Sequence, residues 1–177
     1  MTATQRLELI QPGVCGETWA DFGAGSGAFT TALLEALGPA GRVYAVDRDL
    51  RGLRSHPQVT PLRADFTVSL ELPPLDGILL ANSLHYVRGQ TGFLHSLRRY
   101  LKADGRLIVV EYQDRRPSPW VPYPVSFGRL EALAEGYAVE RIGETPSSFG
   151  GLVYAALLLP SETPPSVNPV WTGPHRL

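Results

Sequence analysis

The sequence predicts an α/β fold built on a Rossmann-like, doubly wound and mostly parallel seven-stranded sheet, with an antiparallel last strand and helices on both faces. Three observations lead to this prediction. Short apolar runs alternate with helical patterns between residues 18 and 111, as in parallel βαβ units. A glycine-rich turn, 23–27, directly follows the first apolar run. Two β-rich runs near the end, 137–142 and 152–159, are too close together for a parallel crossover.

The first elements surround the glycine-rich turn. A short helix is expected over 4–11, where Thr4 can cap the first turn. The first strand is expected at 18–22. A long helix should follow over 26–37, because its apolar residues fall on one stripe and Gly38 can end it.

The middle of the chain carries β-rich or continuously apolar runs, as expected for a sheet that is covered on both faces. These strands are expected at 42–46, 59–63, 75–81 and 106–111. One or two helical turns are expected over 49–55, ended by Pro57. A helix over 91–101 should precede a turn at 103–105.

The pattern changes after residue 111. Residues 117–124 contain four prolines with Trp120 and Tyr123 between them, which predicts a rigid irregular loop. A helix over 126–135 then precedes the two closing strands.

The composition bounds the class of protein. The length of 177 residues favours a single domain, expected over 1–159, with a Pro-rich tail over 160–177 that is extended or disordered. The net charge of −1 gives no reason to expect nucleic acid as a partner. The single cysteine excludes a disulfide framework within the chain, and no apolar run approaches the ~20 residues of a membrane span. These features favour a cytoplasmic protein.

Polar residues follow four successive predicted strands. In open parallel sheets, ligands bind beyond the carboxyl ends of the strands, so these residues should meet at one edge. They are Asp21 with the glycine turn, Asp47, Asp65-Phe66 and Asn82-Ser83.

The glycine turn alone leaves two ligands open. With Ala28 in place of the last glycine it also matches a dinucleotide-binding fingerprint, and Asp47 has the right spacing to accept from a ribose in either case. Asp21 separates the two interpretations, because an acid just before the turn repels a pyrophosphate but favours a ligand with an ammonium and a sulfonium. The second nucleotide-binding half of a full dinucleotide fold is also missing.

These residues together resemble the class I S-adenosylmethionine-dependent methyltransferases, and most closely the type 11 methyltransferase domains. The similarity covers residues 18–111. The matching segments are the glycine motif 21–27, the acid Asp47 and the acid motif 65–66. Segment 82–86 resembles the family's LHH motif, with Tyr86 at the second histidine, and 99–107 resembles its RVLKPGGRL motif.

The resemblance implies a set of cofactor-binding residues around S-adenosylmethionine. The glycine turn would lie behind the methionine moiety and the ribose. The implied residues are Asp21, Phe22, Gly23, Ala24, Gly25, Gly27, Asp47, Arg48, Leu50, Asp65, Phe66, Asn82 and Ser83.

The resemblance also implies individual roles. Asp21 would approach the amino group of the cofactor, although it could also cap the glycine turn or the first long helix. Asp47 would accept from both ribose hydroxyls, and Asp65 from the adenine amino group. Phe66 would border the adenine.

The resemblance implies contacts for the remaining residues as well. Arg48 or Leu50 would pack on the adenine, and Asn82 and Ser83 would lie near the methionine end.

The expected reaction is transfer of a methyl group to a small-molecule acceptor by in-line displacement. His85 is the candidate base, and the alternative is a structural hydrogen bond to a backbone carbonyl. No pair of histidines or acids has metal-ligand spacing, so no metal is expected. Two other functions stay open at this point, a non-catalytic S-adenosylmethionine-binding regulator and an NAD(P)-dependent oxidoreductase.

The acceptor side of the site is expected to be open, because few residues precede the first strand. Trp120 and Tyr123 of the Pro-rich loop, or a second copy in a homo-oligomer, would then complete it.

Overall fold

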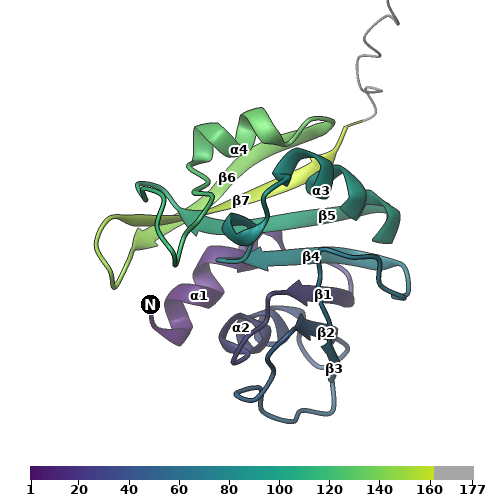
Figure 1. The fold of residues 1–177 in the computed structure, drawn as a ribbon. Coiled ribbons are helices and arrows are strands. Elements are labelled where there is room, and N and C mark those ends of the chain that lie inside the picture. The colour runs from purple at the N-terminus through teal and green to yellow at the C-terminus, as the bar shows by residue number, and fades with distance from the viewer. Residues whose placement is uncertain (162–177) are drawn as a thin grey trace, which may run out of the picture.

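The computed structural model describes residues 1–161 and contains one seven-stranded sheet (Figure 1). Almost all of the predicted tail 160–177 lies outside the described residues. In their order across the sheet, the strands are β3 (Val59–Arg63), β2 (Arg42–Asp47), β1 (Thr18–Phe22), β4 (Leu75–Ala81), β5 (Leu101–Tyr112), β7 (Leu152–Pro160) and β6 (Tyr137–Pro146).

The strand directions confirm the predicted topology. Neighbouring strands from β3 to β5 pair in parallel, and β7 runs antiparallel to both β5 and β6. The chain moves outward from β1 to β3 and then returns to β4 on the other side of β1. The carboxyl ends of β1 and β4 therefore flank the topological switch point, where ligands bind in sheets of this kind.

Helices pack on both faces of the sheet, as predicted. On one face Leu33 joins Trp19 in an apolar cluster with the first two helices, and on the other Leu97 joins Phe22 in a cluster with the last two. The strand side chains alternate between these clusters because successive residues of a strand point to opposite faces. The helices are α1 (Ala3–Ile10), α2 (Ala28–Leu37), α3 (Gln90–Leu97) and α4 (Phe127–Leu133).

The helical turns expected over 49–55 are absent, so that prediction is wrong. The segment forms turns and bends between β2 and β3. Carboxylate oxygens of Asp47 and Asp49 accept the backbone N–H groups two residues ahead, of Asp49 and Arg51. Such local bonds compete with helix formation, and here they hold the segment in turns.

Two further boundaries differ from the sequence prediction. The turn expected at 103–105 is an irregular part of β5, where the register with β4 shifts between Leu75 and Gly77. The first helix is capped by Thr2 rather than Thr4, in a capping box with Gln5. No helix among residues 1–161 is long and apolar enough to cross a membrane.

Candidate active site

The glycine turn lies at the carboxyl end of β1 and is held by β2. The backbone N–H groups of Gly23 and Ala24 both donate to the carbonyl of Val46, at 2.8 and 3.2 Å. A Cβ on Gly23 would lie 2.5 Å from the Ser83 side chain, whereas a Cβ on Gly25 would meet nothing within 4 Å. Gly25 has a φ of 51°, so the turn presents bare backbone to open space there.

Asp21 is fully buried beneath this turn. Its Oδ2 accepts from the Thr30 hydroxyl at 2.6 Å, and its Oδ1 has no partner within residues 1–161. Burial raises the pKa of the carboxyl to about 6, against the smaller effect of the Thr30 bond. A buried carboxylate oxygen without a donor is costly for a folded protein, so it is suited to a cationic or N–H-bearing ligand.

The raised pKa of Asp21 gives a testable effect on stability. Between pH 3.8, the ordinary pKa of an aspartate, and about pH 6, the folded protein holds this proton more tightly than the unfolded chain does. The ionised carboxylate therefore lowers the free energy of unfolding as the pH rises through this window, by about 3 kcal/mol in total. We expect Asp21→Asn to unfold at higher urea than the wild type at about pH 8, with the difference shrinking towards about pH 4. A difference that is constant with pH would contradict this origin.

Asp47 lies at the end of β2 and faces the same turn. Its Oδ2 accepts from the Gly25 N–H and its Oδ1 from the Asp49 N–H, both at 2.9 Å. Each carboxylate oxygen has a second lone pair. The carboxylate borders a shallow pocket of about 530 Å³ that is also lined by Gly25, Ser26, Asp49, Arg51 and Gly52.

Asp65 is engaged on both oxygens. Its Oδ1 accepts from the Thr67 hydroxyl at 2.6 Å and the Thr67 N–H at 2.9 Å, and its Oδ2 pairs with Arg48. The Thr67 hydroxyl is the main cause that lowers the pKa of this carboxyl. The Arg48 side chain is 73% exposed, so solvent competes with this ion pair.

Phe66 and Leu50, also expected near an adenine, lie in different surroundings from each other. The Phe66 ring stacks on Phe22 with 6.0 Å between centroids and also packs against Phe93. Leu50 lines a separate small pocket of about 230 Å³ with Leu53, beside β3.

Asn82 and Ser83 follow β4, next to the glycine turn. Asn82 has a φ of 53°, the only positive φ outside glycine among residues 1–161, and its Oδ1 is buried without a partner. The Ser83 hydroxyl donates to the Phe22 carbonyl at 2.6 Å, which ties the ends of β1 and β4 together. Asn82 thus adds a second unpartnered oxygen to the switch point, beside that of Asp21.

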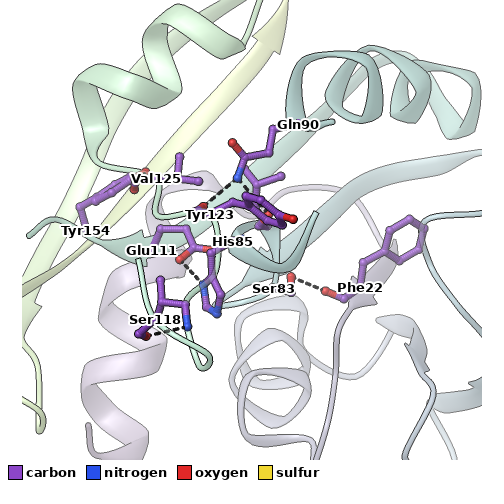
Figure 2. Close-up of polar contacts among 11 residues, drawn as sticks. Phe22, Ser83, His85, Gln90, Glu111, Ser118, Tyr123, Val125 and Tyr154 are labelled. Atoms are coloured by element: carbon purple, nitrogen blue, oxygen red, sulfur yellow. Dashed lines mark hydrogen bonds and ion pairs between the residues drawn. The ribbon is translucent and has the colours of Figure 1, made fainter. Parts of the chain in front are cut away.

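His85 is buried and pairs with a carboxylate, not with a backbone carbonyl (Figure 2). Its Nδ1 lies 2.7 Å from Oε2 of Glu111, and its backbone N–H donates to Oε1 at 3.1 Å. An ionised Glu111 can only accept, so it holds the proton on Nδ1 and leaves the lone pair on Nε2.

Glu111 was not among the residues predicted from the sequence. It lies at the end of β5 and is completely buried. The rule that selected the polar residues after the first four strands applies equally to this acid, which ends the most strongly apolar strand. The sequence could therefore have identified it.

His85 faces a pocket of about 540 Å³ beside the switch point. Its lining residues come from the ends of β4 and β5, the Pro-rich loop and the β6–β7 turn. They are Asn82, His85, Tyr86, Tyr112, Arg115, Ser118, Trp120, Val121 and Phe149.

The Pro-rich loop is fastened to the residues around His85. The Tyr123 N–H donates to the His85 carbonyl at 3.0 Å, and the Gln90 amide donates to the Tyr123 carbonyl at 2.9 Å (Figure 2). Trp120 lines this pocket, whereas Tyr123 contributes these backbone bonds. Within residues 1–161, no group of three or more His, Cys, Asp or Glu side chains could hold a metal ion.

Comparison with known proteins identifies the family. A family model described as a methyltransferase domain matches residues 20–107, which include the glycine turn and the polar strand ends. The chain belongs to the class I S-adenosylmethionine-dependent methyltransferases. This methyltransferase has no significant match among curated protein sequences. The family assignment does not favour the alternative of an NAD(P)-dependent oxidoreductase.

Solved structures share the fold of this methyltransferase at low sequence identity. The 1,6-didemethyltoxoflavin-N1-methyltransferase of Burkholderia thailandensis aligns with a TM-score of 0.67 at 20% identity, over 91% of this chain and 79% of that one. The N-methyltransferase NodS of Bradyrhizobium japonicum aligns with a TM-score of 0.68 at 18% identity, over 90% and 94%. A SAM-dependent methyltransferase of Aquifex aeolicus aligns with a TM-score of 0.62 at 22% identity, over 88% and 92%.

Proposed function

We propose that this methyltransferase holds S-adenosylmethionine against the glycine turn and methylates a small molecule in the pocket beside His85. The observation that carries the proposal is the position of two unpartnered buried oxygens, on Asp21 and Asn82, at the carboxyl ends of β1 and β4. Asp21 comes just before the glycine turn, and Asn82 lines the His85 pocket, so the two residues link the proposed donor site to the proposed acceptor site.

The residues at the switch point fit the cofactor. Oδ1 of Asp21 would bind the ammonium group, directly or through a water, because it lacks a donor. The bare backbone at Gly25 would lie along the methionine and ribose. The second lone pairs of the Asp47 oxygens would accept from the ribose hydroxyls. Asp65 would share its oxygens between the adenine amino group and its present donors.

The chemistry needs little from the protein beyond alignment and one proton acceptor. When bound, S-adenosylmethionine supplies a methyl group on a sulfonium, and the carbon–sulfur electron pair stays on sulfur as the acceptor's lone pair bonds to the methyl carbon. Nε2 of His85 would take the proton that the acceptor loses. Glu111 is a positioning residue, since it fixes the ring and its tautomer through Nδ1.

One structural relative supports a small acceptor, and a second supports the cofactor. The Burkholderia thailandensis enzyme was crystallised with 1,6-didemethyltoxoflavin and S-adenosylhomocysteine, and NodS was also crystallised with S-adenosylhomocysteine. A pocket of about 540 Å³ lies within the range of small-molecule sites.

Substitution of Gly25 tests the cofactor site. A methyl group at Gly25 would project into the open space assigned to the cofactor, so Gly25→Ala should weaken S-adenosylhomocysteine binding about tenfold or more in calorimetry. Gly38→Ala is the matched control, since Gly38 also has a positive φ and open space around it, but lies at the end of α2. Both variants should lose stability through backbone strain. Equal affinities in the two variants would contradict the assignment.

Turnover distinguishes the enzyme from a non-catalytic binding protein. We expect release of S-adenosylhomocysteine from S-adenosylmethionine when a suitable acceptor is present. Tight cofactor binding without product from any acceptor would support a regulatory protein on the same scaffold.

A further inference from the structure

The exposed aromatic side chains of residues 1–161 are concentrated at one place. Among residues 1–161, three large aromatic side chains are strongly exposed: Tyr86 at 54%, Trp120 at 79% and Phe149 at 77%. All three line the His85 pocket, although they come from distant parts of the sequence. Exposed apolar rings that gather around one pocket mark a binding surface.

The backbone of the loop that carries Trp120 is held by hydrogen bonds. Ser118 and Val121 exchange two backbone hydrogen bonds of 3.1 Å, which close a tight turn with Trp120 inside it. The Ser118 hydroxyl accepts a further bond from the Val121 N–H. The same loop is tied to the His85 carbonyl through Tyr123. Because this backbone is already ordered, little backbone entropy is lost when a flat ligand stacks on the ring that it carries.

Arg115 links two parts of the pocket lining, Tyr112 and the turn that carries Phe149. Its guanidinium lies 4.9 Å from the centre of the Tyr112 ring, and it donates to the carbonyl of Phe149 at 3.0 Å. The β6–β7 turn that carries Phe149 is therefore held beside the residues that follow β5 (Figure 1). Of the described residues, Arg115 is also the one with a fixed charge that lines the pocket, and none of the acidic ones lines it.

The base in this pocket selects the kind of proton that can be removed. An imidazole acts best on groups whose acidity is close to neutral. A phenol-type hydroxyl, with a pKa of about 10 as in tyrosine, is a far better partner than a saturated alcohol. The anion that forms as this proton leaves would be stabilised by the positive charge of Arg115.

We propose that the acceptor is a flat aromatic compound with a weakly acidic hydroxyl or ring N–H, stacked on Trp120 with Phe149 at the opposite side. This inference rests on the proposed methyl transfer. The acceptor oxygen or nitrogen forms the new bond to carbon and gives its proton to Nε2 of His85.

The test is binding of matched aromatic and saturated probes to the protein saturated with S-adenosylhomocysteine. We expect 2-naphthol to bind at least about tenfold more tightly than decahydro-2-naphthol, which has similar size and apolar area but no aromatic ring. Trp120→Ala and Phe149→Ala should each weaken 2-naphthol binding about tenfold. Leu159→Ala is the control, because Leu159 is also an exposed apolar residue but does not line the pocket.

The outcomes separate this inference from the proposed function. Equal binding of the two probes, or 2-naphthol binding that neither aromatic variant changes, would overturn the aromatic acceptor. Methylation of cyclohexylamine in preference to 2-naphthol would do the same, while leaving the methyltransferase activity established. Selective binding of 2-naphthol without methylation of any acceptor would uphold the aromatic site and contradict the methyl transfer.

Discussion

Replacing His85 with asparagine is expected to lower kcat about 10²- to 10⁴-fold, the usual contribution of a positioned general base. The asparagine amide can take the place of Nδ1 and donate to Glu111, so the buried carboxylate keeps a partner. What the variant lacks is Nε2, the nitrogen that we propose as the proton acceptor. KM for the acceptor and affinity for S-adenosylhomocysteine should change little. The measurement is steady-state release of S-adenosylhomocysteine.

Chemical rescue separates a catalytic role for His85 from a structural one. In His85→Ala, added imidazole should restore part of kcat, because the deleted ring borders an open pocket. His95→Ala is the control, since His95 is exposed on α3. Unaltered turnover in His85→Asn would leave this histidine with only a structural role.

Glu111→Gln is expected to lower kcat by a similar factor without removing any atom that contacts the acceptor. The amide nitrogen of glutamine can donate to Nδ1, which moves the imidazole proton to Nε2 and blocks its use as a base. An analogous acid-to-amide change next to a catalytic histidine is known to fix the wrong tautomer. Imidazole should not rescue this variant, because the native ring still fills the site.

Replacing Asp47 with alanine is expected to weaken S-adenosylhomocysteine binding about ten- to a hundredfold in calorimetry. Loss of hydrogen bonds between a carboxylate and a diol costs about 1.5–3 kcal/mol. Asp47 also accepts the Gly25 N–H, so the glycine turn loses support at the same time. Asp104→Ala is the matched control, because Asp104 is an exposed acid in the irregular part of β5.

A modified ligand separates these two effects of Asp47. The 2′-deoxy analogue of S-adenosylhomocysteine should bind the wild type more weakly than the parent compound. In Asp47→Ala the two ligands should bind nearly equally, because the acceptor for the hydroxyl is already gone. If the deoxy analogue loses as much affinity in the variant as in the wild type, Asp47 does not contact the ribose.

The sheet was predictable because its signals are local. β3 and β4 begin and end at the predicted residues, since each is a short run that begins within two residues of a proline, Pro57 or Pro74. The reversal of β7 followed from the short connection between 142 and 152, which no parallel crossover can span. The prediction of helical turns over 49–55 was wrong, because the carboxylates of Asp47 and Asp49 accept backbone N–H groups there in place of helical hydrogen bonds.

The sequence by itself determined the fold and the family, and it predicted one edge of the sheet as the site, because motif residues at the ends of parallel strands must meet there. Only the tertiary structure brought Glu111 to His85 and set Trp120 and Phe149 around one pocket. These residues are 26 or more positions from His85 in the chain, and Trp120 and Phe149 are carried by connections rather than strands. The physical reason is that loop positions depend on long-range hydrogen bonds, such as those of Tyr123 and Arg115, which leave no periodic pattern in a sequence.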